Sequence, residues 1–316
     1  VTTFTTGPML SLINFAFKDK TKDTSISTYG NNESYKVLIS FGLATSGRTL
    51  LRLATQMFGQ NKQQVSYTAM HVTLSAEVNL MDIEEFERQS FKPILSEAQK
   101  LNLEIGKEYK TSPDLHKEVN AVVDRDAVNF LLIGAGRSLY TGSILGNIVG
   151  VTKSFSPENL LGTITGARPI LPANDLIDEK AREFLLDTSC DVGVLLDRDF
   201  TGSGKLFVPI FSDEDTFLLN YAKGFADNGT SDIALCDTSG LLELSREAKE
   251  KYDRLLVNHP DKLSLHQEKI IHKDFLDKQE LMLVSYKSWK ALVESKSLWL
   301  DDVPSVLIIR PMFQPE

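Results

Sequence analysis

The sequence predicts an α/β protein made of two tandem doubly wound units, each a five-stranded parallel sheet sandwiched between helices. Nearly continuous apolar runs, such as residues 127–136, alternate with amphipathic helical patterns, which is typical of parallel sheets covered on both faces. This alternation runs to about residue 200 and then starts again. With 316 residues, 42% hydrophobic and 24% charged, the chain has enough apolar mass for two domains of ordinary size.

The first unit is expected over residues 35–200, with an insertion at about 150–189. Its strands are predicted at 35–42, 65–72, 104–110, 127–136 and 190–198, and its helices at 46–59, 83–102 and 115–126. Ser46 and Asp114 are candidate N-caps, because their side-chain oxygens can accept bonds from the free N–H groups of a helix start. Gly59 is a candidate stop signal. Pro93 is expected to kink or split the longest helix, because proline lacks a backbone N–H.

The second unit is expected over residues 201–316. Its strands are predicted at 205–211, 232–238, 263–271, 280–289 and 304–311, and its helices at 213–228, 245–259, 274–279 and 290–298, the first capped by Ser212. The two units correspond segment by segment: NFLLIGAGRS matches ELMLVSYKSW, and SCDVGVLLDR matches VPSVLIIRP. A repeat of roughly 150 residues indicates a duplicated domain. We therefore expect two five-stranded units rather than one large sheet.

The amino-terminal stretch differs from the rest of the chain. The first 17 residues, VTTFTTGPMLSLINFAF, carry no charge, and Lys18, Lys20 and Lys22 follow. This run falls short of the ~20 apolar residues of a full membrane span. A secretory signal would carry its positive charge before the apolar run, whereas lysines after it fit the cytoplasmic side of a membrane helix. We interpret residues 1–34 as the end of a transmembrane segment and a flexible linker; an ordinary amphipathic arm is the alternative.

The composition excludes several classes of function. The net charge of −9 and the pI near 5.2, with no basic stripe studded with aromatic residues, predict no nucleic-acid binding. Cys190 and Cys236 show no metal-ligand spacing, so we expect them in the core of a protein from a reducing compartment. The histidines at 71, 116, 259, 266 and 272 are scattered, and we expect them to be solvated or capping rather than metal ligands. Walker, HExxH and nucleophile-elbow motifs are absent, so we expect no catalytic residue, no metal site and no enzyme.

A glycine-bearing loop after strand 127–136 is the candidate binding site. Glycines between a parallel strand and a helix let the backbone approach an anion, and the helix start adds N–H donors. The candidate residues are Gly134, Gly136, Arg137, Ser138, Gly146 and Asn147. A Gly-x-Gly alone is a weak signal, and tight strand-to-helix packing without a ligand is the alternative.

The corresponding segment of the second unit, VSYKSW, carries no glycine. Tyr286 and Trp289 would block a close approach of the backbone to an anion, and Lys287 is the only residue there that favours phosphate. We expect no nucleotide at that position. The second unit is then a scaffold or a docking surface.

The order of elements resembles the universal stress protein family, whose αβ sandwich of the adenine nucleotide alpha hydrolase type carries a nucleotide site. That family marks its fourth strand with G-x2-G-x9-G-(S/T). Gly136 and Gly146 have the nine-residue spacing, Asn147 stands in place of Ser or Thr, and Ile133 stands in place of the first glycine. Gly162-Thr163 is an alternative closing pair. Family members that bind ATP carry an Asp at the end of the first strand, where this sequence has Gly42.

Three further segments carry a narrower resemblance. The joint PENLLGTITG…DEKAREFLLDTSCDVGVLLDRDF, the start TTFTTGPMLSLI and the end KSWKALVESKSLWLDDVPSVLIIRP are similar to the cytosolic tails of bacterial monovalent cation:proton antiporters of the second family. The resemblance implies a regulatory domain at the cytoplasmic face of the bacterial inner membrane. Its partner would be the transmembrane Na+/H+ or K+/H+ antiporter domain of the same chain. Its signal would be ATP, AMP, another adenine nucleotide or pH, and this part alone would transport nothing.

Two other functions fit the sequence. A stand-alone tandem universal stress protein would bind ATP or AMP in its first unit, but the apolar start of the chain would then have no evident purpose. A ligand-free module would form a homodimer through the strand near 304–311.

Overall fold

The computed structural model describes residues 34–61, 63–73, 83–135, 179–229, 232–266, 271–295, 300 and 302–312. The described residues all belong to one compact unit. The predicted membrane segment and linker therefore fall outside the described residues, as does most of the predicted insertion at 150–189. Within the described ranges no helix is both long and apolar enough to span a bilayer.

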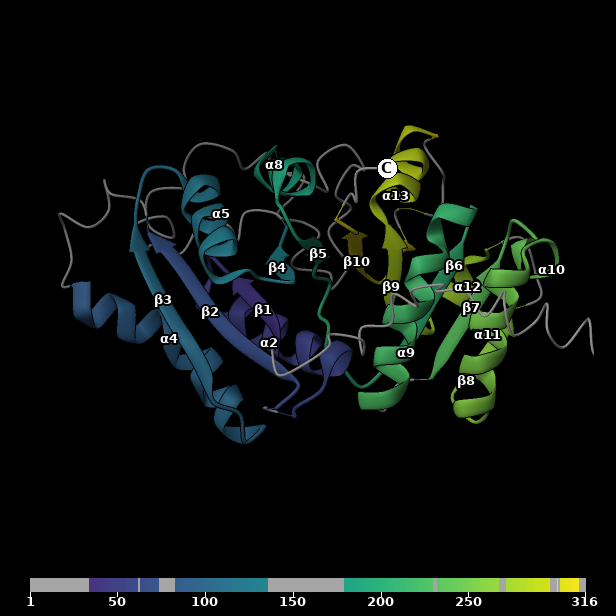
Figure 1. The fold of residues 1–316 in the computed structure, drawn as a ribbon, viewed down its shortest axis with the longest axis horizontal. Helices are drawn as coiled ribbons and strands as arrows, with labels where there is room; N and C mark the ends of the chain where they lie inside the picture. The colour runs from purple at the N-terminus through teal and green to yellow at the C-terminus, as the bar shows by residue number, and fades with distance from the viewer. Residues whose placement is uncertain are drawn as a thin grey trace, which may run out of the picture. The chain divides into compact units, whose positions relative to one another are not determined.

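The ten strands of the described residues form one sheet with the order β3-β2-β1-β4-β5-β10-β9-β6-β7-β8 (Figure 1). The first half of the sheet contains β1 (Tyr35–Ser40), β2 (Val65–Thr73), β3 (Ile105–Thr111), β4 (Phe130–Gly134) and β5 (Asp191–Leu196). The second half contains β6 (Lys205–Ile210), β7 (Ile233–Asp237), β8 (Leu263–His266), β9 (Gln279–Ser285) and β10 (Ser305–Arg310). Strands are parallel within each half, and only the central pair, β5 and β10, is antiparallel. The same doubly wound order thus occurs twice.

The predicted α/β class is confirmed. The expectation of two separate five-stranded sheets is corrected, because all ten strands join in one sheet. Hydrogen bonds continue across the middle, from Val192 opposite Arg310 to Leu196 opposite Val306. The last strand of each unit would otherwise be an edge strand with unpaired N–H and C=O groups, and pairing the two edges satisfies both. The predicted border at residue 200 falls in the loop between β5 and β6. β10 has a neighbouring strand on each side, so its backbone is already paired, and the homodimer through 304–311 stays a prediction.

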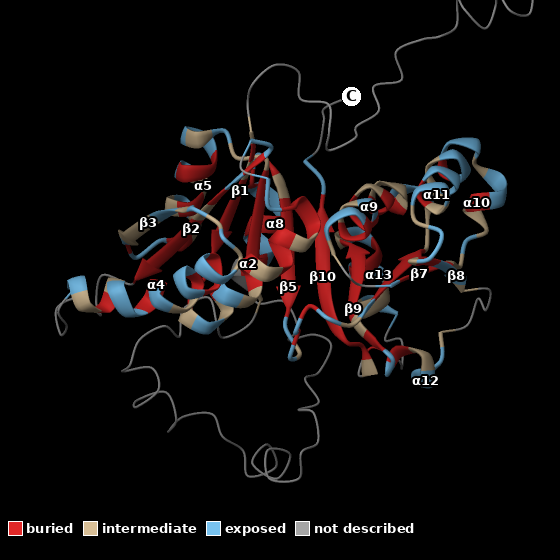
Figure 2. Cartoon of the chain, turned by 90° about the horizontal axis from the view of Figure 1, so that it is seen from below, coloured by how far each residue is buried: buried red, intermediate tan, exposed pale blue. Residues whose placement is uncertain are grey.

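Helices cover both faces of the sheet (Figure 1). One face carries α2 (Ala44–Phe58), α4 (Ile83–Lys100), α9 (Leu218–Asn228) and α11 (Arg246–Asn258); the other carries α5 (Leu115–Asp126), α8 (Glu179–Asp187) and α13 (Tyr286–Glu294). The short elements are η4 (Asp213–Phe217), α10 (Leu241–Leu244) and α12 (Lys273–Leu276). The strands are largely buried (Figure 2), which explains their nearly continuous apolar sequences.

The core crosses the join between the halves on both faces. One apolar cluster links Phe184 of α8 to Phe207 of β6 and Trp289 of α13, and all three side chains are buried. On the opposite face α2 packs against α9, where a Cβ on Gly224 would lie 2.1 Å from Met57 O. Only glycine allows the two helices to approach this closely.

Two arginines strengthen the same join in a nearly symmetric way. Arg310 ends β10, is 3% exposed, and donates to Leu185 O at 2.9 Å and Thr188 O at 2.7 Å, just before β5. Arg198 follows β5 and donates to Val303 O at 2.8 Å, just before β10. Each arginine therefore binds the segment that leads into the last strand of the other half. Carbonyls at the end of α8 are a suitable environment for the Arg310 cation.

Most predicted helix signals hold, and one shifts. Gly59 ends α2 with φ 87°, and Asp114 caps α5 by accepting from Lys117 N at 3.0 Å. Ser46 is not the cap of α2: the helix starts at Ala44 after Leu43, and the Ser46 hydroxyl donates to Leu43 O at 2.7 Å. α4 continues through Pro93 without being split.

The largest error in the second unit concerns residues 286–289, predicted as strand but helical. Ser285 ends β9 and caps α13 directly by accepting from Ser288 N at 3.1 Å. The side chain of Trp289 therefore lies in the core, 2% exposed. Cys190 and Cys236 form no disulfide, and both are buried, as predicted.

Candidate anion sites at the two switch points

Ligands of doubly wound sheets bind beyond the carboxyl ends of the strands, where the strand order reverses. This reversal occurs twice in the described sheet. We call the ends of β1 and β4 with the start of α2 the first switch point. The ends of β6 and β9 with η4 and the start of α13 form the second switch point. Because β5 and β10 are antiparallel, the strands of the two halves run in opposite directions. The two switch points therefore lie at opposite ends of the strands.

Of the predicted site residues, only Gly134 is described. It is the buried last residue of β4 and lies at the first switch point, as expected. Gly136, Arg137, Ser138, Gly146 and Asn147 lie outside the described residues, as does the alternative pair Gly162-Thr163. Their role in a phosphate cradle stays a prediction.

The end of β1 at the first switch point carries an aromatic side chain rather than an acid. Phe41 is 2% exposed, and its ring would lie 3.0 Å from a Cβ on Gly47 in the first turn of α2. It also packs on Phe91, with ring centroids 5.6 Å apart. Neither Phe41 nor Gly42 offers a carboxylate to a ribose.

The second switch point is filled by a carboxylate of the protein itself. Asp215 is 0% exposed, and its Oδ2 accepts from Phe211 N at 2.9 Å and Ser212 N at 3.0 Å. Its Oδ1 accepts from Ser285 Oγ at 2.5 Å, and Ser288 Oγ donates to both oxygens at 2.9 and 2.8 Å. These donors come from the end of β6 and the start of α13, where a bound phosphate would otherwise find them.

Lys287, the residue predicted to favour phosphate there, is engaged in an ion pair with Glu214. The sequence analysis predicted a helix over 213–228 capped by Ser212 and missed the role of Asp215. The available signal was an acid three residues after the cap Ser212, the spacing of a capping box. That signal predicts a bond to the cap, but it does not predict contacts with a strand some 70 residues later in the chain.

The hydrogen-bonded registers allow the two halves to be aligned residue by residue. Val37 of β1 pairs with Phe130 of β4, and Leu206 of β6 pairs with Leu281 of β9. Matching these pairs superimposes the central strands. The helix starts agree with this alignment, because Leu43 and Ser212, the N-caps of α2 and η4, fall on the same position.

In this alignment Gly134 corresponds to Ser285, because they lie four residues after Phe130 and Leu281. Ser46 corresponds to Asp215, because they lie nine residues after Val37 and Leu206. The Ser46 hydroxyl donates back to Leu43 O, within its own helical turn. The described residues of the first switch point therefore lack both the carboxylate and the hydroxyl that fill the second. The two halves share a fold but differ in what occupies the anion position.

His71 lies close to the first switch point and corrects the expectation of solvated or capping histidines. It is 2% exposed, and its Nδ1 donates to Phe41 O at 2.9 Å. Rings of Phe86, Phe91 and Tyr109 surround it. Burial lowers the pKa of His71, while the bond to Phe41 acts in the opposite direction.

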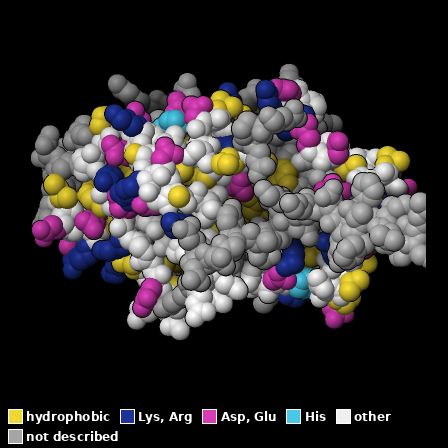
Figure 3. Space-filling model, viewed as in Figure 1, with side chains coloured by type: hydrophobic (Ala, Val, Ile, Leu, Met, Phe, Trp, Pro, Cys, Tyr) yellow, Lys and Arg dark blue, Asp and Glu magenta, His cyan; other side chains and the backbone are white. Residues whose placement is uncertain are grey.

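No group of three or more His, Cys, Asp or Glu side chains among the described residues could hold a metal ion. A hollow of about 420 Å³ lies at the opposite ends of β1 and β2, between Lys36, Ser66, Thr68 and Arg125, away from both switch points. On the face drawn in Figure 3, acidic and basic side chains are interspersed.

Neither the scan against protein-family models nor the search of curated proteins found a match. Solved structures do match. A putative universal stress protein from Pseudomonas aeruginosa is 11% identical over 88% of this chain and 94% of its own, with a TM-score of 0.49. A universal stress protein from Archaeoglobus fulgidus is 14% identical over 88% and 96%, with a TM-score of 0.45. A family member from Arabidopsis thaliana with AMP bound is 18% identical over 36% and 81%, with a TM-score of 0.22.

These are likenesses of fold at low sequence identity. The architecture itself follows from the strand order and registers given above. Chemically, the second switch point has its anion built in, and the first has a glycine strand end beside a helix start. Backbone N–H groups at the start of α2 can hold an anionic ligand at the first switch point.

Proposed function

We propose that this chain is a regulatory module of the universal stress protein type with a single adenine-nucleotide site, at the first switch point. The asymmetry between Ser46 and Asp215 is the observation that carries this proposal. The buried carboxylate of Asp215 at the second switch point repels a phosphate, and it already occupies the hydrogen-bond donors there. The first switch point has no such occupant among the described residues.

The proposed site divides its roles between backbone and side chains. The N–H groups of the first turn of α2 and of Gly134 and Gly136 would contact phosphate oxygens, with Arg137 and Ser138 adding charge and a hydroxyl. Gly146 and Asn147 would close the loop over the phosphates. Because Gly42 replaces the acid that would bind a ribose, we propose that the phosphates supply most of the affinity.

Calorimetric titration with ATP and with AMP tests this site. We expect one nucleotide at the first switch point, and a loss of its affinity of roughly tenfold or more in Gly136→Val, because a side chain there would prevent the close approach of the backbone. Lys287→Ala, at the second switch point, is the control and should bind as the wild type does. An absence of binding, or binding that survives Gly136→Val, would refute the proposed site.

We propose further that the module is the cytosolic tail of a monovalent cation:proton antiporter and biases transport through differential binding of its ligand. Support comes from the three sequence segments that resemble such tails. Deleting residues 35–316 from the intact transporter and measuring Na+/H+ or K+/H+ exchange against pH is the test. We expect a shifted pH profile; an unchanged profile would remove regulation of transport and favour a stand-alone nucleotide-binding protein.

A further inference from the structure

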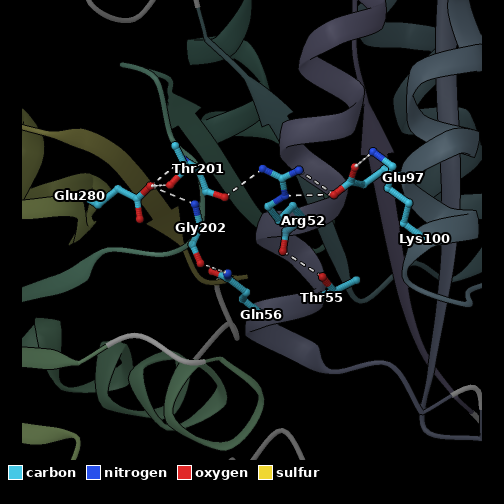
Figure 4. A network of polar contacts seen from close by, with 8 residues as sticks. All are labelled: Arg52, Thr55, Gln56, Glu97, Lys100, Thr201, Gly202 and Glu280. Atoms are coloured by element: carbon cyan, nitrogen blue, oxygen red, sulfur yellow. Dashed lines mark hydrogen bonds and ion pairs between the residues drawn. The ribbon is translucent and has the colours of Figure 1, made fainter.

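The loop between β5 and β6 is built around a carboxylate. Its residues 201–204 have the sequence TGSG, and Thr201 and Gly202 face the carboxylate of Glu280 of β9 (Figure 4). Glu280 Oε1 accepts from Thr201 N at 2.5 Å, Thr201 Oγ1 at 2.5 Å and Gly202 N at 2.9 Å. Its Oε2 accepts from Gly204 N. We call these four converging donors the nest.

Glycine is required at two positions of the nest. Gly202 has φ +84°, a conformation that side chains disfavour, and it directs successive N–H groups toward one point. A Cβ on Gly204 would lie 2.4 Å from the Cβ of Glu280. The loop is therefore shaped for close approach of an anion, as in phosphate-binding loops made of backbone N–H groups.

The carbonyls of the same loop point to the first half of the sheet. Arg52 Nη1 of α2 donates to Thr201 O at 2.9 Å, and Gln56 Nε2 donates to Gly202 O at 2.5 Å. Arg52 is itself held by Glu97 of α4 at 2.7 Å (Figure 4). The loop is thus a joint: its N–H groups bind the second half through Glu280, and its C=O groups bind the first half through α2.

Solvent reaches the nest. Thr201 and Ser203 are exposed, Gly204 and Glu280 are partly buried, and Gly202 is buried. Burial raises the pKa of Glu280, but its hydrogen bonds from Thr201, Gly204 and Gly202 outweigh this and leave the pKa below its ordinary value. The resident group is therefore an ionised carboxylate that an external anion can approach.

We propose that the nest is a second anion site, in which a phosphate group competes with the Glu280 carboxylate. A phosphate carries more negative charge and more acceptor oxygens than a carboxylate, so the same four donors suit it. Its entry breaks the bonds between the loop and β9 but leaves those from Arg52 and Gln56. Phosphate binding thereby loosens the joint between the two halves of the sheet. The site shares no residue with the nucleotide site proposed above.

Amide resonances of Gly202 and Gly204 in the nitrogen-15-labelled protein test this competition. Inorganic phosphate is titrated in one series and ATP in another, with ionic strength held constant by potassium chloride. We expect saturable shifts of both amides in the wild type. Glu280→Ala should raise the affinity for the phosphate group roughly tenfold, since the internal competitor is removed. Glu280→Gln, which keeps the shape but not the charge, should give an intermediate gain.

Glu294→Ala, which removes an exposed carboxylate of α13, is the matched control and should titrate as the wild type does. Dispersed resonances elsewhere verify that each variant is folded, and Gly136→Val should leave the response intact. Shifts with inorganic phosphate identify a free-phosphate site, and shifts with ATP alone identify a phosphate carried by a nucleotide. The proposal is overturned if neither ligand moves Gly202 and Gly204, or if both Glu280 variants bind no more tightly than the wild type.

Discussion

At the scale of the residue, Asp215 shows how one side chain changes the chemistry of a whole half. Its carboxylate accepts from N–H groups at the end of β6 and from the hydroxyls of Ser285 and Ser288. A buried charge is stable only when it is paired or hydrogen-bonded, and here every donor comes from the surrounding backbone turn or from a serine. The position that would receive a ligand has become part of the core.

Replacing Asp215 by alanine should therefore destabilise the protein strongly. The hydroxyls of Ser285 and Ser288 would stay buried without this acceptor, and the half-buried N–H groups of Phe211 and Ser212 would lose theirs. We expect a loss of about 3 kcal/mol or more in the free energy of unfolding. Urea denaturation at neutral pH measures this loss. The exposed neighbour Asp213, replaced by alanine, should change the stability by only about 0.5 kcal/mol. Equal effects of the two substitutions would show that Asp215 has no special role.

His71 makes a prediction about pH. Its folded-state pKa lies below the ordinary value of about 6.5, so the unfolded chain takes up the proton first as the pH falls. The free energy of unfolding should then decrease as the pH is lowered through about 6.5, by at most about 1.4 kcal/mol per pH unit from this residue. His71→Gln should reduce this decrease in denaturation measured between neutral and mildly acidic pH. The same pH dependence in both proteins would contradict the assignment.

At the scale of the element, the contact between α2 and α9 holds the two halves together on one face. Gly224→Ala should weaken it, although alanine favours a helix, because the new Cβ would meet the Met57 carbonyl at 2.1 Å and backbone cannot move as a side chain can. We expect a loss of about 1–3 kcal/mol in unfolding free energy. Lys223→Ala, on the exposed side of α9, should cost only about 0.5 kcal/mol. A neutral or stabilising Gly224→Ala would show that the helices can separate without cost.

Elements could be predicted well where the local sequence decides them. Gly59 and Asp114 act through their own helix ends, so their roles were visible in the sequence. Tyr286 to Trp289 were predicted as strand because β9 and α13 meet without a loop, and an apolar run alone does not mark that junction. Ser46 was predicted to cap α2, but the helix starts two residues earlier at Ala44.

At the scale of the whole molecule, the repeat was evident in the sequence and the joining of its sheets was not. β5 and β10 are apolar on both faces, which indicates burial but not which strand lies alongside. The difference between the switch points was equally hidden, since Ser46 and Asp215 lie 169 residues apart and correspond only through the strand registers. Of the predicted cradle, the described structure places Gly134 alone.

The Ser46→Asp variant, titrated calorimetrically with ATP and AMP beside the wild type, tests most directly whether the first switch point holds the nucleotide. An acid in the first turn suits the helix dipole, so this variant should fold as well as the wild type. The carboxylate that Ser46→Asp introduces should also occupy the first switch point, as the carboxylate of Asp215 occupies the second. The account predicts that Ser46→Asp binds one nucleotide fewer per chain than the wild type; undiminished binding by Ser46→Asp would contradict it.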